Sequence, residues 1–308
     1  MLLEGKERRK DMLKINQLKK AFGSKQVLFG LNFEVKEGRI LGLIGKNGAG
    51  KTTIFHSILN FIDYEGEVTW QGKALTQKDY NKIGYLPEER SLMPKLTVER
   101  QVGFLAQLKG MPRDAIKEEL PHWMERLAVK GKLSDKIKSL SKGNQQKVQL
   151  IATLIHRPQL IILDEPFSGL DPVNVDLMKK EILVQKKRGA TIIFSEHNMR
   201  NVEELCDDVV MIKEGGVALQ GSVNAVRNQF GLTRLFVRTT HSVEEIRQLS
   251  GVEKVEVLND GKYYLHLHDA DDGKALFSYF SQGDYVQTFD QEPPTLNEIF
   301  RLKAGDAS

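Results

Sequence analysis

The sequence predicts an α/β fold in which a mostly parallel sheet is covered by helices on both faces, followed by a smaller α+β domain. Three observations lead to this prediction. The chain has 308 residues, which is more than one typical domain contains. Short apolar runs at 40–44 and 160–163 alternate with segments of helical periodicity, as in a buried parallel sheet. Near residues 221–222, glycine-rich turns give way to short alternating segments, which indicates a domain boundary.

The predicted organisation is an N-terminal extension at 1–10, a first domain at 11–222, a second domain at 223–303 and a tail at 304–308. The first domain is expected to open with two strands at 13–18 and 31–35 around the turn 22–25. Its other predicted strands lie at 39–44, 67–71, 82–86, 159–163, 190–195 and 209–213. Its predicted helices lie at 51–60, 174–187 and 199–205, and the whole segment 97–157 has a helical pattern.

The composition excludes several classes of protein. Hydrophobic residues make up 40% and charged residues 28% of the chain, and the mean hydropathy of −0.36 is ordinary for a folded domain. No apolar run approaches the ~18–20 residues of a membrane-spanning helix, and no apolar stretch of a signal peptide follows the basic N-terminus. The single cysteine, Cys206, favours a reducing cytosol and excludes a cysteine-based metal site. The net charge of +4 is too weak to indicate nucleic-acid binding, and we expect none.

A complete phosphate-binding motif lies between the predicted strand at 39–44 and the predicted helix at 51–60. The segment 45–52 matches G-x-x-x-x-G-K-[ST] at every fixed position. Glycines let backbone N–H groups curve around phosphates, Lys51 reaches the outer phosphates, and Thr52 offers a hydroxyl group to Mg²⁺. The residues expected to bind the nucleotide, in this segment and directly after it, are Gly45, Lys46, Asn47, Gly48, Ala49, Gly50, Lys51, Thr52 and Thr53.

Two further segments carry residue types suited to phosphate chemistry. An apolar strand ends in Asp164 and Glu165, at the edge of the sheet where α/β proteins bind ligands. Asp164 is predicted to hold Mg²⁺ through its water shell and Glu165 to polarise an attacking water. Ser141 is a good helix cap and Gly143 permits close backbone approach, so this segment offers a second helix N-terminus suited to an anion. Taken alone, an ordinary capped helix is the simpler interpretation of that last segment.

Together, in their order along residues 12–222, these motifs resemble the nucleotide-binding subunit of an ATP-binding cassette (ABC) transporter. The resemblance implies a P-loop ATPase domain with a RecA-like core, an antiparallel β subdomain and an α-helical subdomain. It implies that Ser141 and Gly143 belong to a signature loop that contacts the γ-phosphate bound by a second subunit, so that two ATPs lie in a head-to-tail dimer. The segment 168–172 resembles the D-loop, His197 the switch histidine, and Phe22 the aromatic residue that stacks on adenine.

The sequence departs from the family pattern in two places. The usual L-S-G-G-Q signature reads L-S-K-G-N, although Ser141 and Gly143 are kept. The Q-loop glutamine is replaced by Glu88, which accepts hydrogen bonds but lacks the amide donor. Both variants resemble the exporters called ABC-2 type, which include drug-resistance and sodium-export ATPases. The resemblance implies catalytic roles for Lys51, Glu165 and His197 and a Mg²⁺ site at Thr52, Glu88 and Asp164.

The second domain is predicted to follow the order β-α-β-β-α-β, which is typical of a ferredoxin-like unit. Its predicted strands lie at 235–238, 252–258, 262–268 and 285–290, and its helices at 243–249, 271–280 and 295–303. His266 and His268 share one face of a strand, but two polar positions on a solvated face explain them without a metal. The segment also resembles, more distantly, the accessory domain of ABC-2-type ATPases, which implies a regulatory or dimer-stabilising role.

The resemblance implies an ATPase at the cytoplasmic face of the cell membrane that uses ATP and Mg²⁺ to drive a separate transmembrane permease of ABC-2 type. Export is implied rather than import, and the second ATPase is either another copy or a related chain. Residues after Glu88, up to about Val98, would face the permease. One alternative is a non-transport ABC ATPase that acts on ribosomes or DNA, although such chains usually carry two cassettes or a long coiled coil. The other is a P-loop kinase or GTPase, against which the signature, D-loop and switch histidine argue.

Overall fold

The computed structural model describes residues 12–89, 91–282 and 285–305. The chain divides into two compact units, one reaching to Gln220 and one beginning at Gly221. The predicted N-terminal extension at 1–10, and residues 306–308 of the predicted tail, lie outside the described residues. Within the described ranges, no helix is both long enough and apolar enough to cross a membrane.

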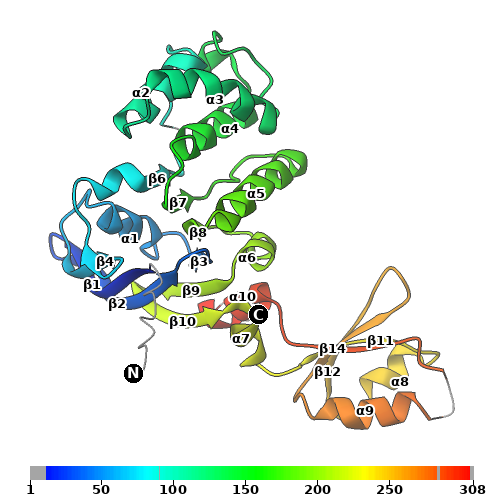
Figure 1. Cartoon of the computed structure of the whole chain (residues 1–308). Helices are drawn as coiled ribbons and strands as arrows, with labels where there is room; N and C mark the ends of the chain where they lie inside the picture. Colours follow the sequence, from blue (N-terminus) through cyan, green and yellow to red (C-terminus); the bar gives the residue numbers. More distant parts are fainter. Residues whose placement is uncertain (1–11, 90, 283–284, 306–308) are drawn as a thin grey trace, which may run out of the picture. The chain divides into compact units, whose positions relative to one another are not determined.

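The first unit is built around a six-stranded sheet of order β10-β9-β3-β8-β7-β6 (Figure 1). Its strands are β3 (Ile40–Ile44), β6 (Ile83–Leu86), β7 (Leu160–Asp164), β8 (Thr191–Ser195), β9 (Asp208–Lys213) and β10 (Gly216–Ser222). Strands β6, β7, β8, β3 and β9 pair in parallel, which confirms the predicted parallel sheet. Every residue of β3, β7 and β8 is buried, as a sheet covered on both faces requires. At its carboxyl edge, the strand register places Asp164 beside Ser195.

Helices connect these strands in two groups. Helices α1 (Lys51–Ile58), α5 (Pro172–Lys187) and α6 (Met199–Leu205) each follow a strand of the parallel sheet. Helices α2 (Val98–Leu108), α3 (Arg113–Arg126) and α4 (Lys142–Leu154) come between β6 and β7 and lie together at the top of Figure 1. Short 3₁₀ turns are η1 (Asp79–Lys82) and η2 (Ile137–Ser139). Within 97–157, the sequence predicts helix starts near Pro112 and Pro121. The first is confirmed, because Pro112 is the N-cap of α3, and the second is wrong, because Pro121 lies inside α3. The helical pattern is also interrupted near Gly110 and Gly131, which adopt φ values of +85° and +154°.

An antiparallel sheet of order β2-β1-β4-β5 shares one hydrophobic core with the parallel sheet and α1. Its strands are β1 (Met12–Phe22), β2 (Lys25–Lys36), β4 (Glu65–Trp70) and β5 (Lys73–Ala74). Phe22 pairs with Lys25, which confirms the predicted turn, and both strands are longer than predicted. Alternate residues of β2 are buried from Leu31 to Val35, so one face of this sheet packs into the core.

The second unit contains a four-stranded sheet of order β12-β13-β11-β14, in which the recorded pairs are antiparallel. Its elements are α7 (Val223–Asn228), β11 (Arg234–Arg238), α8 (Val243–Arg247), β12 (Val252–Val257), β13 (Tyr263–Leu267), α9 (Asp272–Phe280), β14 (Thr288–Glu292) and α10 (Leu296–Ala304). The order β-α-β-β-α-β from β11 to β14 confirms the sequence prediction. Helix α7, which begins at the predicted domain boundary, was not predicted.

One strand of the second unit begins later than predicted. The prediction placed it at 285–290, whereas β14 spans Thr288–Glu292. Tyr285 precedes the strand and is 88% exposed, so its side chain adds nothing to the core of the second unit. Elsewhere in this sheet, His266 Nε2 of β13 lies 3.2 Å from Glu256 Oε1 of β12, and the histidine therefore has a carboxylate partner.

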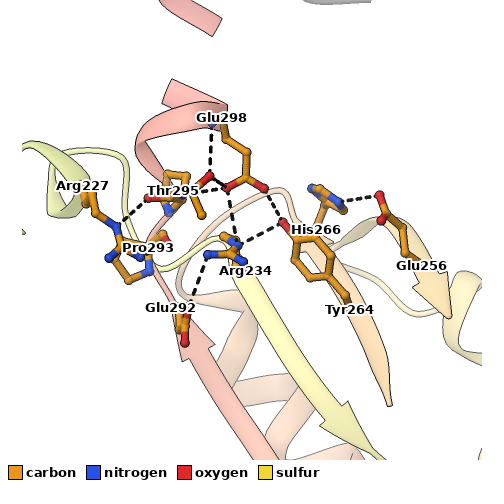
Figure 2. Close-up of polar contacts among 10 residues, drawn as sticks. Arg227, Arg234, Glu256, Tyr264, His266, Glu292, Pro293, Thr295 and Glu298 are labelled. Atoms are coloured by element: carbon orange, nitrogen blue, oxygen red, sulfur yellow. Dashed lines mark hydrogen bonds and ion pairs between the residues drawn. The ribbon is translucent and has the colours of Figure 1, made fainter. Parts of the chain in front are cut away.

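Polar contacts fasten α10 to the sheet of the second unit (Figure 2). The hydroxyl group of Tyr264 donates to Glu298 Oε1 at 2.8 Å and lies 3.2 Å from Arg234 Nε. Thr295 caps α10, since its Oγ1 accepts from the backbone N–H of Glu298 at 3.2 Å. Burial raises the pKa of Glu298, but hydrogen bonds from Thr295 and Tyr264 and the charge of Arg234 bring that pKa below its ordinary value. The Glu298 carboxylate thus joins the first turn of α10 to β13 and β11.

Candidate nucleotide-binding site

The loop between β3 and α1 is a tight backbone turn that tolerates no side chain at two of its glycines. A Cβ on Gly45 would lie 2.6 Å from the carbonyl oxygen of Ile212, and a Cβ on Gly50 would lie 2.7 Å from Leu28 Cδ2. Gly50 also adopts φ +108°, a conformation that L side chains rarely adopt. At Gly48, by contrast, a Cβ would meet nothing within 4 Å. The loop is therefore closely packed on one side and open on the other, as a phosphate cradle requires.

Lys51, the first residue of α1, is 7% exposed and points its ammonium group back into the loop. Its Nζ donates to the carbonyl oxygen of Gly45 at 2.9 Å and to that of Lys46 at 3.4 Å. Burial lowers the pKa of Lys51, while the nearby Glu165 and Asp164 carboxylates favour its charged form. A cation that donates to two carbonyl oxygens at a helix N-terminus is well placed to bind an anion instead.

A chain of hydrogen bonds connects α1 with the carboxyl ends of β7 and β8. Thr52 Oγ1 donates to Asp164 Oδ2 at 3.1 Å, and Ser195 Oγ donates to Asp164 Oδ1 at 2.6 Å. Ser195 Oγ in turn accepts from the backbone N–H of Glu165 at 3.0 Å. A hydroxyl group and a buried carboxylate form the kind of oxygen donor set that fits Mg²⁺. Ser195 was not predicted from the sequence, although its place at the end of a strand neighbouring Asp164 was the available signal.

Glu165 combines burial with an unusual backbone. It is 5% exposed and adopts φ +49°, in the left-handed region. His197 Nε2 lies 3.0 Å from Glu165 Oε1, yet the two atoms form no hydrogen bond, and no described residue supplies a donor to this buried oxygen. Burial, followed by the negative charge of Glu196, raises the pKa of Glu165 to about 7. An oxygen with free acceptor capacity and a pKa near neutrality suits a general base.

His197 lies just beyond β8 with 46% of its side chain exposed. Burial of the rest, and then the positive charge of Lys51, lower its pKa below the ordinary value, so the ring is neutral at pH 7. The backbone N–H groups of His197 and Asn198 donate to Glu196 Oε1 at 2.9 and 3.1 Å. Glu196 therefore fixes the turn that presents the imidazole beside Glu165.

These groups line one cavity of about 250 Å³. Its lining residues are Val27, Asn47, Gly48, Gly50, Lys51, Thr52, Thr53, Glu88, Asp164, Glu165 and His197. All except Val27 were predicted to bind nucleotide or metal or to be catalytic; an apolar residue of β2 carries no sequence signal for ligand contact. Gly45, Lys46 and Ala49 belong to the same loop but do not line the described cavity. Glu88 brings a further carboxylate to it and favours the charged form of Lys51.

Three other predicted residues, Phe22, Ser141 and Gly143, do not line this described cavity. Phe22 ends β1 and is 51% exposed, with Lys20 Nζ 4.9 Å from the centre of its ring. Ser141 caps α4, since its Oγ accepts from the backbone N–H of Asn144 at 3.3 Å. Gly143 lies in the first turn of α4. Ser141 and Gly143 thus form a second helix N-terminus, separate from the cavity.

Models of known families match both units. The model described as ABC transporter matches residues 28–168, and the model described as ATP-binding protein DrrA1-3-like, C-terminal domain, matches residues 221–304. A solved ATP-binding subunit of an ABC transporter superposes with a TM-score of 0.68 at 30% identity, covering 76% of this chain and 97% of that one.

Relatives with names align over most of the chain. The uncharacterized ABC transporter ATP-binding protein YhaQ of Bacillus subtilis is 38% identical over 96% of this chain and 99% of its own length. The linearmycin resistance ATP-binding protein LnrL of the same organism is 31% identical, over 80% of this chain and 82% of its own. The Nod factor export ATP-binding protein I of a Rhizobium species is 29% identical, over 94% and 95%. The chain therefore belongs to the ABC transporter family, as an ATP-binding subunit that hydrolyses ATP.

Proposed function

We propose that two copies of this chain bind two Mg²⁺·ATP in a head-to-tail dimer, which drives a separate permease of ABC-2 type. The observation that carries the proposal is that one chain presents two parts of a phosphate site that do not meet. One part is the cavity with Lys51, Thr52 and Glu165, and the other is the helix N-terminus at Ser141 and Gly143. Two-fold symmetry can bring the second part of each chain onto the cavity of the other.

In this proposal the loop and α1 hold the phosphates. Lys51 exchanges the carbonyl oxygens of Gly45 and Lys46 for phosphate oxygens, which gives the buried ammonium group charge-assisted hydrogen bonds in place of neutral acceptors. Thr52, Asp164 and Glu88 hold Mg²⁺, directly or through water. When bound, Mg²⁺ neutralises phosphate charge and so makes the terminal phosphate a better electrophile.

Glu165 is proposed to act on the attacking water. Its buried Oε1 has no donor among the described residues, so it can accept the proton of a water molecule, and its pKa of about 7 allows that transfer near neutral pH. The hydrogen bond from its backbone N–H to Ser195 Oγ fixes its position relative to Asp164. The neutral imidazole of His197 can donate a hydrogen bond to the terminal phosphate.

We further propose that the subunit works at the cytoplasmic face of the membrane and that transport is export. Relatives named for linearmycin resistance and for Nod factor export support the direction, because they align over most of the chain. The residues between Glu88 and Val98 would contact the permease. Because the relatives compared are transporter proteins, they favour transport over an action on ribosomes or DNA.

The variant Glu165→Gln tests the dimer, because it removes the base while keeping the size of the side chain. We expect ATP with Mg²⁺ to raise the mass of the variant, measured by light scattering, from that of one chain to that of two chains. The double variant Glu165→Gln with Lys51→Ala is the matched control, since it lacks the phosphate-binding cation and should stay at the mass of one chain. A Glu165→Gln protein that binds ATP but remains monomeric at every concentration would refute the proposed sandwich.

A further inference from the structure

Helix α4 lies against β6, the strand at one edge of the parallel sheet, and polar side chains of the helix face that strand. No strand in the described part of the chain pairs with the outer side of β6, so the carbonyl groups there need other partners. The polar groups lie on one face of α4 and its extension, at spacings of four and three residues. The contacts are Gln149 Nε2 to Pro87 O at 3.2 Å, Thr153 Oγ1 to Tyr85 O at 3.3 Å, and His156 Nε2 to Ile83 O at 3.3 Å. The Thr153 hydroxyl group also lies 2.9 Å from the carbonyl oxygen of Gln149, one helical turn earlier, so it shares its proton between two acceptors.

Gln149 differs from the other two because it reaches beyond the strand into the loop that carries Glu88. Its Nε2 donates to the carbonyl oxygen of Pro87 and, at 3.4 Å, to that of Glu89. These two carbonyl groups flank Glu88 in the sequence, and the Glu88 side chain lines the nucleotide cavity. Gln149 itself is 3% exposed and does not line that cavity as described. It therefore touches the backbone on both sides of a site residue without touching the site.

Pro87 removes one means by which this loop could hold its conformation. Pro87 has no N–H group, so it cannot donate a backbone hydrogen bond that would hold this turn. An apolar side chain at position 149 would leave the two carbonyl groups facing a buried surface without a donor. The loop would then move toward water, and a displacement of about 1 Å is enough to misplace a group that acts on a metal-bound phosphate.

We infer that Gln149 is a positioning residue for ATP hydrolysis, which holds the loop 87–89 so that the Glu88 carboxylate faces the metal-binding side of the nucleotide cavity. The inference rests on the proposed role of Glu88 at Mg²⁺. It assigns to α4 a function beyond presenting Ser141, because the same helix then determines the position of a metal-binding carboxylate in its own chain.

The test compares Gln149→Leu with Thr153→Val. The control variant removes a polar group that faces the carbonyl oxygen of Tyr85, two residues before Pro87. For Gln149→Leu we expect kcat for ATP hydrolysis to fall about tenfold. The Mg²⁺ concentration for half-maximal rate should rise, while the Kd for ATP measured without Mg²⁺ stays within about twofold of wild type. Thr153→Val should keep kcat and the Mg²⁺ requirement within about twofold of wild type. Gln149→Met, which keeps the unbranched shape, replaces Gln149→Leu if that variant loses its folded tryptophan fluorescence.

A double-variant comparison decides whether Gln149 acts through Glu88. If it does, Glu88→Ala with Gln149→Leu is no slower than Glu88→Ala alone. Losses that multiply in the double variant, or a normal Mg²⁺ requirement in Gln149→Leu, would overturn the inference while leaving the role of Glu88 intact. A Glu88→Ala protein with wild-type rate and Mg²⁺ requirement would instead refute the proposed role of Glu88, and the inference with it.

Discussion

Replacing Glu165 with glutamine should stabilise the nucleotide-free protein, by an amount that depends on pH. Burial raises the pKa of Glu165 from an ordinary 4.5 to about 7, a difference that corresponds to about 3 kcal/mol. Because the folded chain holds this proton more tightly than the unfolded chain, stability falls as the pH rises from 4.5 to about 7, and the full cost persists above pH 7. Glutamine does not titrate. The stability gain of Glu165→Gln should therefore be near zero at about pH 4.5 and about 3 kcal/mol at about pH 8.

Tryptophan fluorescence during urea unfolding measures this gain. The two tryptophans of the chain, Trp70 and Trp123, are buried and lie in the first unit, so their fluorescence follows the unit that contains the site. Glu118→Gln, at an exposed position, is the control for losing one negative charge, and its effect on stability should stay within about 0.5 kcal/mol at both pH values. A Glu165→Gln variant whose stability gain is the same at low and high pH, or which is less stable than wild type at pH 8, would refute the reasoning.

Three further predictions concern the site and the second unit. Because Glu165 must be ionised to accept a proton, kcat/KM for ATP hydrolysis should rise about tenfold per pH unit below pH 7 and level off above it; a flat profile would contradict its role as base. Gly45→Ala should abolish ATP binding in a nucleotide-binding assay, because its Cβ would lie 2.6 Å from the carbonyl oxygen of Ile212, and binding at wild-type affinity would show that the loop can shift. Tyr264→Phe removes the donor to Glu298 and should destabilise the second unit by about 1 kcal/mol in hydrogen exchange, with ATP hydrolysis unchanged.

Features with local spacing could be predicted from the sequence. The conformation of the segment from Gly45 to Thr52 is determined by neighbouring residues, because its glycines and the start of the following helix form one continuous turn. Asp164 and Glu165 could likewise be recognised, because an apolar run ends just before the two carboxylates. The parallel sheet follows from short continuous apolar runs, and the order of elements in the second unit follows from short alternating segments.

Features that depend on contacts between residues far apart in the chain could not be predicted from the sequence. Ser195 reaches Asp164 only because β7 and β8 are neighbours in the sheet, and the two residues are separated by 31 positions. The sequence gives no reason to single out Gln149 among the polar residues of its helix. Its role becomes apparent only when α4 is placed against the outer side of β6. The strand expected at 285–290 begins only at Thr288, where pairing with β11 starts, and Tyr285 before it is exposed.

Mixing two inactive variants tests the proposed dimer most directly. Lys51→Ala removes the phosphate-binding cation, and Ser141→Asp keeps a helix-capping residue but adds a negative charge where the partner's γ-phosphate would lie. In a head-to-tail dimer, a mixed pair has one intact site, which combines Lys51 of one chain with Ser141 of the other. An equal mixture should therefore recover about a quarter of the wild-type ATPase activity, although each variant alone is inactive. A mixture that forms mixed dimers without recovering activity, or a fully active Ser141→Asp protein, would contradict the account.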